Sequence, residues 1–231
     1  MWIPYGANID ASDYSGRFKV AWSSAENLLY FIVEIVDDAA VGGFVKDVTE
    51  EIHNFDIIEV FIDEDKSGGY HVFDGKSNTA FGLGVNAENA FSYHIYADFP
   101  DKNKVVKDKI VLDNDGNSWS NRRWVDYSDH FPEFAFRKEG NTYRREFSLI
   151  VYNDTYEKDN VEDSRVKLHT GKVIGLSLAY CDNDGLNESP ETRDNFFGSV
   201  NVKAGAYNDH WKNADDYGTF KLVSGGIKSE K

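Results

Sequence analysis

Residues 29–38 read Leu-Tyr-Phe-Ile-Val-Glu-Ile-Val-Asp-Asp, and this stretch carries the clearest structural signal in the sequence. The positions on one side of it are all apolar: Leu29, Phe31, Val33 and Ile35. Successive side chains of a β-strand point to opposite faces, so a period of two predicts a strand with one core face and one mixed face. The acidic pair at 37–38 ends the strand.

The stretch 56–63, Asp-Ile-Ile-Glu-Val-Phe-Ile-Asp, follows the same rule. The alternation divides it into two faces, with Ile58, Val60 and Ile62 on one, and Ile57, Glu59, Phe61 and Asp63 on the other. The polar, glycine-containing residues 64–69 predict a turn directly after it.

Further short strands are predicted along the chain, separated by clusters of Asp, Asn and Gly. They span residues 81–85, 91–96, 105–112, 134–137, 143–151, 173–180, 197–202 and 218–223. A helical turn is expected within 41–52, and a long loop excursion over 98–133. Many strands without alternating helices predict an all-β fold, a two-sheet antiparallel β-sandwich of the jelly-roll or immunoglobulin-like kind. We expect one domain over 1–224 and a flexible tail over 225–231.

The composition excludes several classes of protein. The 231 residues include 25 Lys and Arg against 40 Asp and Glu, a net charge of −15, which disfavours nucleic acid and anionic membranes as partners. No stretch approaches the roughly 18–20 apolar residues that cross a bilayer, so membrane insertion is not expected. The single cysteine, Cys181, excludes an internal disulfide.

Paired carboxylates raise the possibility of an enzyme. Glu59 and Asp63 point the same way from one predicted strand, and glycosidases use two carboxylates about 5–10 Å apart. A β-sandwich glycoside hydrolase that uses Glu59 with a second acid is therefore the alternative to a binding function. The HExxH, GxSxG and phosphate-loop motifs of other enzymes are absent from the sequence.

Two further kinds of residue suggest ligand binding. Asp182-Asn-Asp-Gly185 and its look-alike Asp113-Asn-Asp-Gly116 offer clustered oxygens that suit Ca²⁺, although neither completes an EF-hand loop. Trp211 lies in a polar segment between two predicted strands, where its ring either stacks on a sugar or folds back onto the core. His53 and His71 flank the strand of Glu59, and His94 lies on a nearby strand.

Several blocks in order resemble carbohydrate-binding module family 9. They are Phe18–Trp22, Leu29–Asp38, Asp56–Asp63 and Ile174–Asp184, followed by Trp211 and Tyr217–Leu222. The resemblance implies a β-sandwich, structural calcium and glycan binding without catalysis, in modules often attached to polysaccharide-degrading enzymes. We expect Asp37, Asp38, Asp182 and Asp184 to hold the calcium.

The resemblance also implies a sugar site, carried over residue by residue. Trp211 matches one tryptophan of the family's sugar sandwich, Asn208 matches a nearby asparagine, and Glu59 matches a hydrogen-bonding glutamate. His53 stands where the second tryptophan is expected and Ala179 where a glutamine is expected. Tyr93 or His94 replaces an arginine. The expected carbohydrate-binding residues are therefore Trp211, Glu59, Asn208, His53, His94 and His71.

The sequence thus predicts a monomeric, non-catalytic glycan-binding module that acts outside the cytoplasm, secreted, periplasmic or at the cell surface. The expected partners are a glycan and an enzyme or a cell-surface assembly. Besides the glycoside hydrolase, a haem-binding sandwich domain stays open, although Met1 is the only methionine and ligation by two histidines would be required. A structural docking domain is the fourth alternative.

Overall fold

A computed structural model describes a series of separate stretches of the chain. They are residues 12–39, 55–69, 71, 90–96, 110–112, 124–126, 130–153, 155–156, 160–184, 193, 195–202 and 209–225. The predicted strand at 81–85, the helical turn at 41–52 and most of the predicted tail lie outside the described residues.

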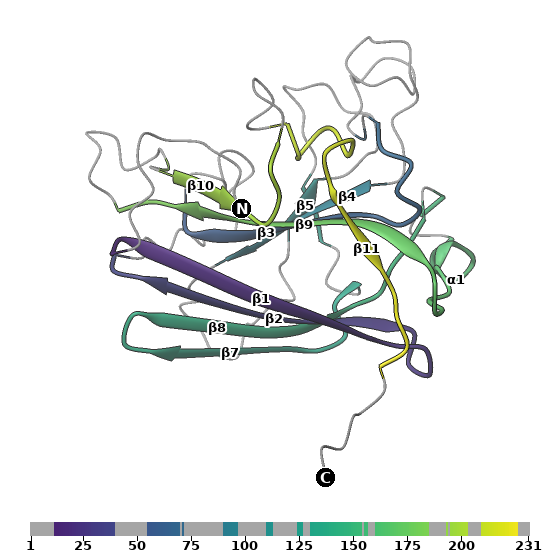
Figure 1. The fold of residues 1–231 in the computed structure, drawn as a ribbon, viewed down its shortest axis with the longest axis horizontal. Helices are drawn as coiled ribbons and strands as arrows, with labels where there is room; N and C mark the ends of the chain where they lie inside the picture. The colour runs from purple at the N-terminus through teal and green to yellow at the C-terminus, as the bar shows by residue number, and fades with distance from the viewer. Residues whose placement is uncertain are drawn as a thin grey trace.

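The described strands form two antiparallel sheets, which face each other as the two layers seen in Figure 1. The smaller sheet has the order β1 (Tyr14–Ser23), β2 (Leu28–Asp37), β8 (Thr142–Leu149) and β7 (Phe134–Glu139). The seven-stranded sheet runs β10 (Asn195–Gly198), β9 (Val173–Asp182), β3 (Ile57–Asp63), β4 (Ala90–Tyr96), β5 (Ile110–Leu112) and β6 (Trp124–Asp126), with β11 (Gly218–Lys221) also paired to β9. The one helix described is the single turn α1 (Val161–Ser164). The predicted all-β sandwich is confirmed.

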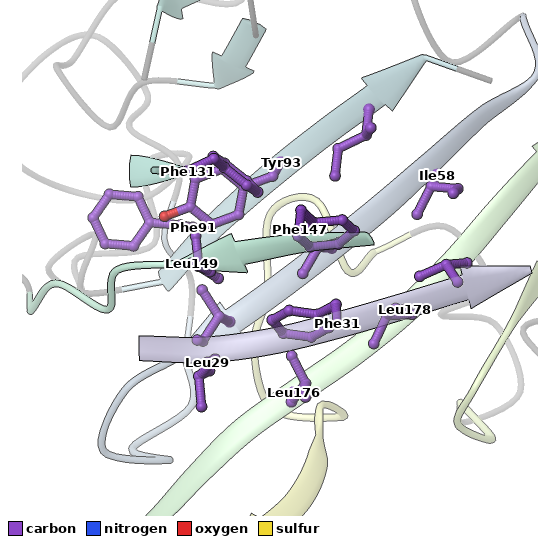
Figure 2. Close-up of a cluster of buried hydrophobic side chains, with 14 of the residues drawn as sticks. Leu29, Phe31, Ile58, Phe91, Tyr93, Phe131, Phe147, Leu149, Leu176 and Leu178 are labelled. Atoms are coloured by element: carbon purple, nitrogen blue, oxygen red, sulfur yellow. The ribbon is translucent and has the colours of Figure 1, made fainter. Parts of the chain in front are cut away.

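The main core fills the space between the two sheets, as the period of two predicts. Figure 2 shows Leu29 and Phe31 of β2 facing Ile58 of β3 and Leu176 and Leu178 of β9 across this layer. The rings of Phe31 and Phe147 stack at its centre, with their centroids 4.9 Å apart. Burial of these apolar side chains is the main favourable contribution to folding.

The region 98–133 differs from its prediction as a long loop. The structure places β5 and β6 there, and they continue the larger sheet beyond β4. An unpaired β4 would leave a row of backbone donors and acceptors at the edge, and even short strands satisfy some of them. β5 falls within the predicted strand 105–112, whereas β6 was not predicted, because the apolar alternation in its three residues is too short to indicate a strand.

Replacing Phe147 with alanine is expected to destabilise the fold strongly. Its ring is 3 % exposed and contacts three other aromatic rings, so the substitution leaves a cavity between the sheets. Such truncations cost about 3–5 kcal/mol, which for a domain of this size lowers Tm by on the order of 10 °C. Thermal unfolding followed by circular dichroism measures the shift. Glu146→Ala, on the exposed side of the same strand, is the control and should change Tm little.

No helix among the described residues is long and apolar enough to cross a membrane.

Candidate functional site

The outer face of β3, away from the small sheet, carries a row of residues from three strands. Glu59 lies in the middle of β3, directly opposite His94 of β4 on one side and Ala179 of β9 on the other. Tyr93 points into the main core instead. The register therefore decides between the two sequence alternatives, because His94 and not Tyr93 shares the face of Glu59.

Glu59 is the charged centre of this face. It is 3 % exposed, and its Oε1 lies 3.4 Å from Nε2 of His94 and 3.3 Å from Sγ of Cys181. Burial by itself raises the pKa of this carboxyl. The hydrogen bond and charge of His94, and the charge of Arg193, outweigh burial and bring the pKa to about 2. Glu59 is therefore held as an anion by its hydrogen bond with His94 and by the positive charge of Arg193.

Two members of this polar group were missed by the sequence analysis. Nη1 of Arg193 donates to Sγ of Cys181 at 3.1 Å, and its guanidinium lies 4.4 Å from the centre of the Phe196 ring. Arg193 lies eleven residues after the end of β9 and Cys181 is near the end of β9, so only the folded chain brings them beside Glu59. The alternation of the predicted strand 173–180, continued by one residue, puts Cys181 on the face of Ala179, and this is the one signal that could have indicated it.

Trp211 lies on the same side of the larger sheet. It is half-buried in a turn between β10 and β11, and it packs against a second apolar cluster on the outer face of this sheet. That cluster includes Ile57 and Phe61, which flank Glu59 along β3, together with Tyr217. Trp211 therefore packs on this outer cluster and remains partly exposed, and its stacking on a sugar stays a prediction.

The remaining expected sugar-binding residues differ in what the structure describes. His71 is buried beside the turn of Trp211, where its Nε2 lies 3.0 Å from the carbonyl oxygen of His210. His53 and Asn208 lie outside the described residues. The sugar contacts of all six residues stay a prediction.

The carboxylate of Asp63 is engaged by the backbone of the turn that follows β3. Asp63 shares the outer face with Glu59, but its carboxylate accepts hydrogen bonds from the backbone N–H groups of Lys66 and Gly68 at 2.9 and 2.8 Å. Burial raises its pKa to about 6. These bonds hold the turn after β3, which includes Gly68 and Gly69 at positive φ.

The expected calcium ligands fall into two neighbouring clusters. Oxygens of the buried residues Asp37, Asp56 and Asp182 lie within 4.8 Å of one another, and so do those of Asp13, Asp38 and Asp184. Asp37 ends β2 in one sheet, whereas Asp182 ends β9 in the other. Asp56 and Asp13 were not among the predicted ligands. Asp56 immediately precedes Ile57, which pairs with Cys181, so the register brings Asp56 beside Asp182.

The chemistry of the buried cluster fits a hard cation. Asp37 accepts a bond from the Tyr180 hydroxyl, Asp56 from the backbone N–H of Asn183, and Asp182 from the side-chain amide of Asn195. Oδ1 of Asp182 is buried without a hydrogen-bond partner among the described residues. Burial, together with the charges of Asp13, Asp37 and Asp184, raises the pKa of Asp182 to about 8 against the bond from Asn195. Clustered carboxylate oxygens with spare lone pairs are the ligands that Ca²⁺ prefers.

A comparison of the sequence with protein families identifies one match over almost the whole chain. Residues 3–225 match the carbohydrate family 9 binding domain-like family. The chain belongs to this family. It is accordingly a non-catalytic carbohydrate-binding domain. No curated protein matches the sequence significantly.

Solved structures of family 9 modules share the fold of this family 9 domain. A carbohydrate-binding module of family 9 from Caldicellulosiruptor kristjanssonii in complex with cellotriose superposes with a TM-score of 0.57 at 14 % identity, covering 100 % of this chain and 86 % of that one. A complex of a family 9 module from the same organism with glucose gives a TM-score of 0.55, again at 14 % identity, with coverages of 100 % and 88 %. At 14 % identity, these comparisons show that the chain shares the β-sandwich fold of the two structures.

Acid is expected to destabilise the family 9 domain between pH 6.5 and 4. Burial lowers the pKa of both His71 and His210 to about 4. The charges of Asp216, Glu59 and Asp209 act against burial at His210, and that of Lys66 acts with it. Both rings are neutral in the folded protein but take up protons on unfolding below pH 6.5. The free energy of unfolding is therefore unaffected by these two histidines above pH 6.5, and it decreases as the pH falls from 6.5 through 4.

The expected size follows from about 1.36 kcal/mol per pKa unit, which gives roughly 2–3 kcal/mol for each histidine at pH 4.5. Urea unfolding at pH 7.5 and pH 4.5 measures it. His71→Gln should flatten the pH dependence, whereas the exposed His169→Gln should leave it unchanged. A free energy of unfolding that is equal at both pH values would contradict the assignment.

Proposed function

We propose that this domain binds glucose-containing oligosaccharides of the cellotriose type on the outer face of the seven-stranded sheet. The observation that carries the proposal is the placement of the half-buried Trp211 on the same apolar cluster that surrounds Glu59 and His94. An aromatic ring beside fixed polar groups is the arrangement that binds a pyranose, because the C–H face of the sugar packs on the ring while the hydroxyls make hydrogen bonds. Complexes of family 9 modules with cellotriose and glucose support this ligand class.

In this proposal each residue has a distinct role. Trp211 stacks on the sugar, while Glu59 accepts hydrogen bonds from hydroxyls and His94 donates to or accepts from them. Glu59 and His94 are only 3 % and 4 % exposed, so hydroxyls reach them when side chains that cover this face move aside. Arg193, which is buried beside Glu59 and donates to Cys181, is one of the side chains on this face.

We also propose that Asp37, Asp56 and Asp182 bind a structural calcium ion, with Asp13, Asp38 and Asp184 forming a second, more exposed cluster. The ion would join the end of β2 in one sheet to the end of β9 in the other. It would also compensate the repulsion among three buried carboxylates, which is costly without a counter-charge. We propose a structural role, because Asp37 and Asp182 are the last residues of strands in different sheets.

The biological setting that we propose is outside the cytoplasm, where the domain would serve polysaccharide degradation by holding an attached or associated enzyme on its substrate. A module that binds its sugar weakly is useful in that setting. Once the module is bound to the polysaccharide, a linked enzyme is held at a high effective concentration near its substrate.

A glycan array with the purified domain tests the proposed ligand class. We expect signals on β-linked glucans, and cellotriose should compete for them. The same samples should release no reducing ends from xylans or glucans. Binding confined to glycans without glucose would contradict the proposal. Reducing ends that vanish in Glu59→Gln would restore the glycoside hydrolase alternative.

A further inference from the structure

The backbone carbonyl of His210, directly before Trp211, accepts hydrogen bonds from two buried side chains. The hydroxyl of Tyr217 donates to this oxygen at 2.8 Å, and Nε2 of His71 lies 3.0 Å from it. Because a carbonyl oxygen can only accept, Nε2 of His71 must carry the proton. The same Nε2 lies 2.9 Å from the Tyr217 hydroxyl oxygen, which closes a small three-membered network.

This network fixes the orientation of the peptide group between His210 and Trp211. The carbonyl of His210 belongs to the planar peptide bond between His210 and Trp211, so two donors on its oxygen restrain the orientation of that plane. His71, His210 and Tyr217 are 1 %, 2 % and 3 % exposed. Rotation of this plane would leave the two buried donors without an acceptor, and water cannot readily replace it. Such a rotation therefore costs free energy.

Backbone hydrogen bonds hold the rest of the turn against Gly69 and His71. The N–H of His71 donates to the carbonyl of Lys212 at 2.9 Å, and the N–H of Ala214 donates to the carbonyl of Gly69 at 2.8 Å. The N–H of Gly69 in turn donates to Oδ1 of Asp215 at 2.9 Å. Trp211 therefore lies between two anchored points, the carbonyl of His210 before it and the carbonyl of Lys212 after it.

We propose that His71 and Tyr217 are positioning residues that set the orientation of the Trp211 ring for stacking on the sugar. They act through the backbone of the turn and do not touch the ligand. This role, which replaces direct sugar binding by His71, rests on the proposed function, since the orientation of Trp211 matters for binding only if Trp211 contacts the sugar. A preorganised ring loses less entropy on binding than one that must be ordered by the ligand.

Titration of cellotriose into Tyr217→Phe tests the proposal. This variant keeps the ring and removes only the hydroxyl that donates to His210. We expect the Kd for cellotriose to rise at least about five-fold at 25 °C, the scale set by one lost buried hydrogen bond. Phe147→Leu, a truncation in the main core between the sheets, is the control for general destabilisation and should bind within about two-fold of the wild type. An unchanged Kd in Tyr217→Phe, or equal losses in both variants, would overturn the proposal.

A readout that needs no sugar separates this inference from the proposed function. In protein labelled with 5-fluorotryptophan, the ¹⁹F resonance of Trp211 is assigned by its loss in Trp211→Phe. We expect this resonance to shift or broaden in Tyr217→Phe and to stay in place in Phe147→Leu. An unperturbed Trp211 signal in Tyr217→Phe would contradict the positioning role whether or not sugar binds. A Trp211 signal that is perturbed in Tyr217→Phe, combined with a wild-type protein that fails to bind cellotriose, would retain the positioning role and refute the proposed ligand.

Discussion

Trp211→Ala is expected to abolish binding of cellotriose while the domain remains folded. The ring is the large aromatic surface of the turn beside Glu59, and it is only half-buried, so its removal takes away the stacking surface with little loss from the core. Aromatic side chains contribute much of the contact area in such sites, and a small ligand has few other contacts to compensate. Calorimetric titration with cellotriose and thermal unfolding measure the two effects.

Trp22→Ala provides the matched control for Trp211. Trp22 is also partly buried, but it lies on β1 of the other sheet, where its Nε1 donates to the carbonyl of Val223 at 2.8 Å. We expect Trp22→Ala to lower Tm and to retain sugar binding, the reverse of the pattern for Trp211→Ala. Wild-type affinity in Trp211→Ala would remove Trp211 from the site.

If the proposed calcium ion binds, its removal is expected to lower Tm by about 8–16 °C. A ligand present at a thousand times its Kd stabilises the fold by about 4 kcal/mol, and each kcal/mol corresponds to about 2–4 °C in a domain of this size. Differential scanning calorimetry with 1 mM Ca²⁺ and with excess chelator measures the shift. Mg²⁺ should restore little of it, because Mg²⁺ is smaller and demands octahedral geometry.

Asp182→Asn is the variant that assigns this effect to the buried cluster. It should abolish the response to Ca²⁺, and without Ca²⁺ it should be at least as stable as the wild type, because the buried cluster disfavours a charge on this side chain and an amide carries none. Asp163→Asn, an exposed acid of α1, should respond to Ca²⁺ as the wild type does. A wild-type Tm that is the same with Ca²⁺ and with chelator would refute the calcium site.

The local alternation of apolar residues was sufficient to predict the sandwich. The core positions Leu29, Phe31 and Val33 of β2 are buried as expected, since a strand's two faces are set by its own sequence. The same pattern could not show that both faces of β3 are buried. The outer face is covered by segments near Phe196 and Tyr217, more than a hundred residues away in sequence.

The candidate sites show the same division between local and distant information. Glu59 and Trp211 could be selected from the sequence because each stands out in its own segment. The choice of His94 over Tyr93 needed the register of β3 with β4. Asp56 joined the metal cluster only because β3 pairs with β9, and Arg193 joined Glu59 only through the fold. Contacts between distant segments are set by packing and register, which a short sequence motif does not encode.

The most direct test of the central claim is a titration of ¹⁵N-labelled protein with cellotriose, followed by NMR. If the sugar binds on the outer face of the larger sheet, the indole signal of Trp211 and the amide signals of Glu59, His94 and Cys181 should shift together along one saturable curve. Shifts confined to the outer face of the β1-β2-β8-β7 sheet, or no shifts at saturating sugar, would contradict the account.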